Sequence, residues 1–328
     1  MNRTKSRRCA LILTLLTVSA TAQAVTLVLD KTLDAPIGVV QMVYSPQYQK
    51  LVLRDIGSRI AVLDTETGTS TVRNSVTQFT DLSISPDGSV VFAADYGGEN
   101  IGYGTPYKTS YVHRYTFETA KWGRKSAYIA GRIQAVSSTR VLLQSMDQWV
   151  TFTNNKWDSE SDALSITNSS DGYYSPGFYA GVYYGDFRYV PATKRIVHGN
   201  TGSSSSEITA FKLVDGNFVG QEATGTYGSA DGYGGTLALS TDGRTIYYGQ
   251  LAVDSSDVTR KRRVFPTPIY AATANVAFAS TAIYAVANGA NLGKLAGNPT
   301  IYALNPAGTD LWTYDTARNK LRHYTVAP

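Results

Sequence analysis

Two aspartates, Asp81 and Asp186, are the residues of this sequence best placed to do chemistry. Each stands near the start of a short alternating stretch typical of a β-strand. Carboxylates that meet near one axis can bind a hard cation such as Ca²⁺ or act as general acid and base. They can equally accept hydrogen bonds from neighbouring strands. The residues alone do not decide between these two roles. Ca²⁺ is the only cofactor that the sequence suggests.

Other catalytic chemistry is sparse in this chain. Its three histidines, His113, His198 and His323, are too far apart to form a zinc-binding signature. Only His198 falls near the expected mouth of the fold. The chain contains no GxSxG elbow, HExxH motif or phosphate-binding loop. We therefore favour a non-catalytic role, with enzyme activity as the alternative.

Tyrosines gather in segments rich in glycine, serine and asparagine, at 96–110, 167–185 and 226–235. Tyrosine in such company is typical of adaptable recognition surfaces, because it offers a large amphipathic contact at a small cost in entropy. The alternative is that these side chains pack the loops against one another. The predicted ligand-binding residues are Tyr103, Tyr107, Tyr174, Tyr179, Tyr184, Tyr233, Asp171 and Asp231.

A repeat that runs along the chain must position these residues. Six segments share an alternating strand, a tight turn and a second apolar strand: 39–55, 79–95, 132–147, 185–200, 235–250 and 274–288. Successive turns lie 40, 52, 53, 50 and 40 residues apart. Periods of about 40 to 50 residues with several short strands indicate the blades of a β-propeller.

A second hairpin follows most of these pairs, for example at 59–75 and 310–326. Each blade is thus expected to hold four strands, numbered here from the axis outward. The fold class is all-β, a single propeller of six or seven blades. Segment 25–30 is expected to pair with the last blade and close the ring, and segment 289–309 to hold remnants of a seventh blade.

The longest insertions are expected on one face of the propeller. Connections from second to third strands (96–110, 199–207, 289–299) and from fourth to first strands (167–185, 226–235) lie there. Function on a rigid scaffold concentrates in such loops. The basic run 260–263 falls in the outer hairpin of the fifth blade. It is expected either to form a solvated outer strand or to bind an anionic partner. The tryptophans are expected to pack between blades.

The Ser-Pro-Asp-Gly turn at 85–88 and the Asp-Thr-Glu-Thr-Gly turn at 64–68 resemble those of bacterial propellers of the WD40-like and YVTN-repeat kind. Lactonase-type and TolB-type propellers are among them. The resemblance covers most of the chain at the level of the repeat. It implies a fold and not an activity, because such repeats host many functions.

The first 24 residues resemble a cleaved export signal. A basic segment (Arg3–Arg8) is followed by an apolar stretch and by Ala22-Gln23-Ala24, a small-x-small cleavage site. The predicted domain is 25–328, beginning at Val25. Its 26 basic and 25 acidic residues leave a net charge of +1, which does not favour nucleic acid. The one cysteine, Cys9, lies in the signal.

The sequence thus predicts a periplasmic or secreted, monomeric propeller with no transmembrane span in the mature chain. Its partner would be a protein or a carbohydrate bound by the tyrosine-rich loops. The alternative is a lactonase- or lyase-type enzyme that uses Asp81 and Asp186 around a cation in the axial channel.

Overall fold

The structure, a computed structural model, describes residues 26–97, 109–146, 149–170, 177–201, 206–227 and 237–327. These residues form strands and turns and no helix, and the strands make seven antiparallel sheets of four. The prediction of an all-β propeller is confirmed, with seven blades. Seven strands, one from each blade, contact one another around the central axis.

The blades are numbered in chain order and their strands are given from the axis outward. Blade 1 holds β2 (Gln41–Ser45), β3 (Lys50–Arg54), β4 (Arg59–Asp64) and β5 (Ser70–Asn74). Blade 2 holds β6 (Gln78–Ile84), β7 (Val90–Tyr96), β8 (Ser110–Thr116) and β9 (Lys121–Ala127). Blade 3 holds β10 (Arg132–Ala135), β11 (Arg140–Gln144), β12 (Phe152–Lys156) and β13 (Ser165–Ser169). Blade 4 holds β14 (Gly185–Val190), β15 (Arg195–Asn200), β16 (Ser206–Val214) and β17 (Asn217–Tyr227).

The last three blades are less regular. Blade 5 holds β18 (Leu237–Leu239), β19 (Thr245–Tyr248), β20 (Leu251–Asp254) and β21 (Lys261–Val264). Blade 6 holds β22 (Ile269–Ala272), β23 (Val276–Ala279), β24 (Ile283–Ala285) and β25 (Asn291–Gly293). Blade 7 holds β26 (Ile301–Leu304), β27 (Asp310–Asp315), β28 (Lys320–Ala327) and β1 (Thr26–Asp34).

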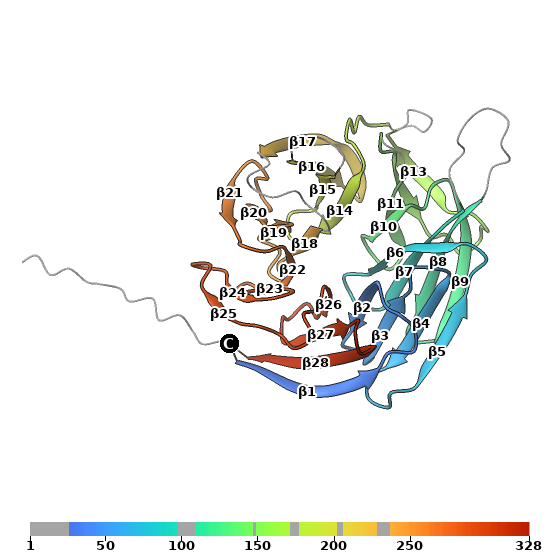
Figure 1. Ribbon diagram of the computed structural model, residues 1–328. Helices are drawn as coiled ribbons and strands as arrows, with labels where there is room; N and C mark the ends of the chain where they lie inside the picture. Colours follow the sequence, from blue (N-terminus) through green and yellow to red (C-terminus); the bar gives the residue numbers. More distant parts are fainter. Residues whose placement is uncertain are drawn as a thin grey trace, which may run out of the picture.

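The N-terminal strand closes the ring. β1 pairs with β28 from Thr26↔Ala327 to Asp34↔Lys320, and the two run side by side in Figure 1. One blade is thereby shared between the two ends of the chain, so the open sheet edges of a linear array are avoided. The expected closure by segment 25–30 agrees with this pairing, and the paired strand extends to Asp34.

Two strand assignments in the last blades were wrong. Segment 274–288 is the second and third strand of blade 6, because the innermost strand is β22, which precedes this segment and pairs with β23. The hairpin at 310–326 is likewise the second and third strand of blade 7, because β1 supplies the fourth. Segment 289–299 is not a connection between second and third strands, because it contains β25, the fourth strand of blade 6. Segment 289–309 does hold part of a seventh blade, as predicted, because it contains β26, the innermost strand of blade 7.

Seven apolar clusters occupy the seven interfaces between neighbouring blades. The cluster between blades 7 and 1, for example, packs Trp312 against Leu51 and Leu53. Burial of this kind contributes about 25 cal/mol per Å². It holds the blades rigidly enough to position the loops at their ends.

Tight turns between first and second strands repeat the same chemistry. In blade 2 the Ser85 hydroxyl donates to Asp87 and accepts from the Val90 N–H. Gly88 takes a φ of 70°, which favours glycine. Ser240, Asp242 and Gly243 repeat the arrangement in blade 5. This turn chemistry produced the recurring sequence signal.

Candidate functional site

One face of the propeller carries the connections from second to third strands and from fourth strands to the next blade. We call it the loop face, and the opposite face the turn face. Six large apolar side chains lie exposed on the loop face, all in blades 1 to 4: Val40, Ile56, Val76, Tyr128, Trp149 and Tyr179. The other exposed large apolar residues of the described chain lie on third or fourth strands, at Val28, Leu29, Val72, Val214, Val219 and Leu292. On the loop face, the exposed large apolar side chains thus lie over the arc of blades 1 to 4.

Two of these loops hold their apolar side chains out by local hydrogen bonds. Ile56 and Val76 are 76% and 88% exposed, and the Gln78 amide links their loops by donating to the Ile56 carbonyl. Asp55 caps the first of the two by accepting from the N–H groups of Gly57 and Arg59. The apolar tips are therefore displayed by ordered turns.

An aromatic pair marks the loops of blades 3 and 4. The rings of Trp149 and Tyr183 lie 4.2 Å apart, and a β-bridge joins the two residues. Trp149 is 58% exposed, so the expectation that it packs between blades was wrong, because it lies in a loop beyond the end of β11. Trp122, Trp157 and Trp312 do pack in inter-blade clusters. The exposed Trp149 offers a large recognition contact.

The structure places two of the eight predicted ligand-binding residues. Tyr179 is 77% exposed on the loop face. Tyr184 is half-buried at the channel mouth, where it forms a side-chain hydrogen bond with Arg132. The other six predicted residues lie outside the described residues: Tyr103, Tyr107, Tyr174, Tyr233, Asp171 and Asp231.

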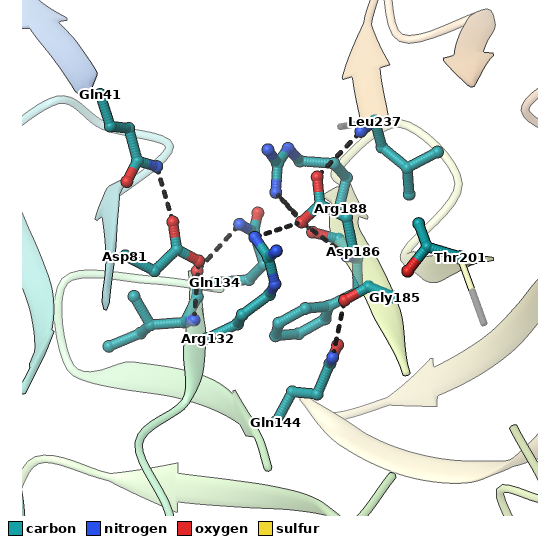
Figure 2. A network of polar contacts seen from close by, with 12 residues as sticks. Gln41, Asp81, Arg132, Gln134, Gln144, Gly185, Asp186, Arg188, Thr201 and Leu237 are labelled. Carbon is teal, nitrogen blue, oxygen red and sulfur yellow. Dashed lines mark hydrogen bonds and ion pairs between the residues drawn. The ribbon is translucent and has the colours of Figure 1, made fainter. Parts of the chain in front are cut away.

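The two aspartates singled out from the sequence lie at the axis and link blades. Gln41 of blade 1 donates to Asp81 of blade 2 at 2.6 Å, and the second oxygen of Asp81 accepts from the Ile133 N–H of blade 3 at 3.0 Å. Figure 2 shows the contact between Gln41 and Asp81. Asp81 thus joins the inner strands of three blades.

Asp186 continues this pattern. It contacts Arg132 of blade 3 at 3.4 Å and Arg188 of its own strand at 2.8 Å, and accepts from the Leu237 N–H of blade 5 at 2.8 Å. These contacts surround Asp186 in Figure 2. Together Asp81 and Asp186 link the inner strands of blades 1 to 5.

We call these two aspartates with Gln41, Arg54, Arg132 and Arg188 the channel network. All of these residues except Asp186 line a cavity of about 160 Å³, and a wider one of about 570 Å³ opens toward the turn face. Three guanidinium groups face two carboxylates. Burial lowers the pKa of Arg54, whereas Asp186 and Asp81 outweigh burial and raise the pKa of Arg132.

Hydrogen-bond donors of the protein surround the carboxylates of Asp81 and Asp186. Every carboxylate oxygen accepts a hydrogen bond from an N–H group of the protein. Within the described part of the chain, no group of three or more His, Cys, Asp or Glu residues is placed to hold a metal ion. The arrangement supports the role in which Asp81 and Asp186 accept hydrogen bonds from neighbouring strands.

His198 lies in the core of blade 4. Its ring is fully buried, and neither nitrogen has a hydrogen-bond partner among the described residues. Burial, followed by the charge of Arg132, lowers the pKa of His198 to about 3. The imidazole is therefore neutral at physiological pH.

The arginines of the channel network were not found from the sequence. One signal was present for Arg188, because alternation along β14 places it on the same side of the strand as Asp186. Arg132 had no such signal, since its partner Asp186 comes from another blade. Arg54 lies opposite Gln41 across the β2–β3 pair of its own blade and donates to it at 2.7 Å.

No family model and no curated protein matches this chain. Among solved structures, a chain of the mitotic checkpoint complex is similar at 10% identity and a TM-score of 0.63, over 100% of this chain and 99% of that one. The β-propeller domain of Myceliophteria thermophila Cps50 (Swd1) is similar at 11% identity and a TM-score of 0.59, over 91% and 99%. The chain is similar in fold to WD40 β-propellers.

No helix in the described residues has the length and apolar character needed to cross a membrane.

Proposed function

We propose that this chain is an exported, non-catalytic propeller that recognises a protein partner through its loop face. The observation that carries the proposal is the one-sided display of Val40, Ile56, Val76, Tyr128, Trp149 and Tyr179. Large exposed apolar side chains gathered on one face are typical of interaction sites. Aromatic side chains among them commonly become the anchors of an interface.

Three features support a protein over a carbohydrate. The exposed residues include aliphatic side chains, Val40, Ile56 and Val76, which suit an apolar protein surface. They span loops of four consecutive blades, a width that suits a macromolecular interface. The likeness to WD40 propellers supports the proposal by analogy of fold only.

Site-specific photocrosslinking tests the proposal. A benzophenone side chain at Val76, on the loop face, is compared with one at Val214, an exposed apolar residue at the turn face. We expect a discrete, protease-sensitive adduct from Val76 alone. Trp149→Ala combined with Tyr179→Ala should reduce its yield at least about fivefold, because interface aromatics commonly contribute about 2 kcal/mol or more.

Thermal unfolding of the double variant provides the control, since both side chains are largely exposed and their loss should leave the core intact. Equal adducts from both faces would contradict the assignment of the loop face. An adduct that resists protease and is removed by glycosidases would favour a carbohydrate ligand instead.

A further inference from the structure

A groove of about 500 Å³ lies between the outer halves of blades 5 and 6. Blade 5 contributes its sheet face, including Tyr247, Ala252 and Phe265, and blade 6 contributes Val286 and Ala287. The groove exists because the two outer strands of blade 6, β24 and β25, have only three residues each. They do not cover the outer part of the neighbouring sheet.

The basic run Arg260–Arg263 lines this groove, together with one acid, Asp254. Arg262 pairs with Asp254 at 2.8 Å. Burial raises the pKa of Asp254, but hydrogen bonds from Ser256 and Arg262 outweigh it and hold the pKa at about 2. Asp254 is thus ionised at neutral pH and pairs with Arg262.

Neutral polar groups also lie in and beside the groove. Arg263 donates to the carbonyl oxygens of Asn288 and Ala287 at 2.8 and 3.1 Å, so its charge faces no carboxylate there. The buried hydroxyl of Tyr247 has no hydrogen-bond partner among the described residues. Burial raises its pKa, so the hydroxyl stays protonated and can donate. The groove therefore offers positive charge, a neutral hydroxyl donor and aromatic surface.

The strand that carries this charge is also an open edge. β21 ends the sheet order β18-β19-β20-β21, so within the described sheet only one of its two edges is paired. Basic residues on an edge strand oppose pairing with a second copy of the same strand. They favour an added strand of opposite charge, because electrostatic complementarity selects the partner.

We propose that an acidic peptide segment in extended conformation adds to the edge of β21 and places its carboxylates against the basic run that lines this groove. Backbone hydrogen bonds to an exposed edge would supply affinity, and the charges would supply specificity. The site is separate from the loop face and does not depend on the function proposed above.

A labelled peptide of alternating glutamate and valine, measured by fluorescence anisotropy, tests the proposal. We expect it to bind in a salt-sensitive manner, and its glutamine counterpart to bind at least about tenfold more weakly. Arg260→Glu with Lys261→Glu should weaken the acidic peptide by about tenfold or more. Both side chains are exposed, so thermal unfolding should be unchanged.

The matched control is Lys121→Glu with Arg124→Glu on β9, which makes the same change in net charge at two exposed positions of blade 2. It should leave affinity within about twofold, since exposed charges beyond a Debye length are screened. Equal weakening by both double variants would overturn the groove as the binding site.

Backbone methylation separates strand addition from charge alone. An acidic peptide with alternate N-methylated residues keeps its carboxylates and loses hydrogen-bond donors, so we expect at least about tenfold weaker binding. Undiminished binding of that peptide would overturn strand addition. Displacement of the acidic peptide by a sulfated oligosaccharide at lower concentration would assign the groove to a different class of polyanion and overturn the proposal.

Discussion

Replacing Asp186 by alanine should destabilise the propeller more than any other single change in the channel network. The carboxylate is buried and accepts from the Leu237 N–H at 2.8 Å and from the Phe187 N–H at 2.9 Å. It also contacts Arg188 at 2.8 Å and Arg132 at 3.4 Å. The substitution removes a shared acceptor for blades 3, 4 and 5 in one step.

The magnitude follows from those contacts. Breaking a buried ion pair costs about 3–5 kcal/mol, and each buried donor left unpaired costs about 1–3 kcal/mol. Both guanidinium side chains keep 23% of their exposure and can be partly rehydrated, which reduces the total. We therefore expect a loss of about 3–4 kcal/mol for Asp186→Ala, and about 1–2 kcal/mol for Asp186→Asn, which keeps one oxygen acceptor.

Denaturant unfolding followed by tryptophan fluorescence measures the loss as a shift of midpoint at constant slope. Asp34→Ala is the control, because the Asp34 side chain is 83% exposed and its pair with Lys320 should contribute less than about 1 kcal/mol. A wild-type midpoint for Asp186→Ala would refute the assigned role in linking blades.

The same denaturant assay tests whether a cation binds at Asp81 and Asp186. A bound ion stabilises the folded state by mass action, so calcium would raise the wild-type midpoint and a chelator would lower it. Because N–H groups occupy the carboxylate oxygens, we expect equal midpoints in calcium and in chelator. A calcium-dependent shift that Asp186→Asn abolishes would instead support the lactonase- or lyase-type alternative.

Three further outcomes are expected. N-terminal sequencing of exported material should begin at or near Val25; an intact basic N-terminal segment on that material would contradict export by a cleaved signal. Deleting β1 (Thr26–Asp34) should cost about 3 kcal/mol or more, since β28 loses its paired edge, and an unchanged melting temperature would contradict closure by this strand. Burial raises the pKa of Asp95, but hydrogen bonds from His113, Ser75 and Thr77 outweigh it and lower the pKa. The ionised carboxylate therefore stabilises the fold above about pH 3.9, and this stabilisation is lost as pH falls through the folded-state pKa. Asp95→Asn should accordingly weaken the dependence of the unfolding free energy on pH in the acid range.

The repeat could be predicted from the sequence because its signals are local. Alternating strands and Ser-x-Asp-Gly turns depend on neighbours a few residues apart, and Ser85 and Ser240 show the same contacts in the structure. Blade 6 was harder because its strands are short, and blade 7 because it takes its outermost strand from the other end of the chain. Only a closed ring brings Thr26 beside Ala327.

In the candidate site, too, local signals could be predicted from the sequence and contacts between distant segments could not. Strand starts identified Asp81 and Asp186, but their partners Gln41, Ile133 and Leu237 lie 40 or more residues away in sequence. Aromatic composition pointed to the loops that carry Tyr179. It did not identify Ile56 or Val76, since a single aliphatic residue in a loop has no pattern that separates an exposed tip from a packed one.

The two proposed recognition surfaces occupy different arcs of the ring. The exposed apolar residues lie over blades 1 to 4, whose inner strands, with that of blade 5, are linked by the channel network. The groove lies where blade 6 becomes thin, and none of its lining residues belongs to the apolar set on the loop face. One ligand on each surface therefore leaves the other surface accessible. A partner that carried both an apolar patch and an acidic extended segment would gain from the second contact through effective concentration rather than through new contacts. Substitutions on either surface alone would then weaken such a partner only partly, whereas changes on both would reduce its affinity to that of non-specific binding.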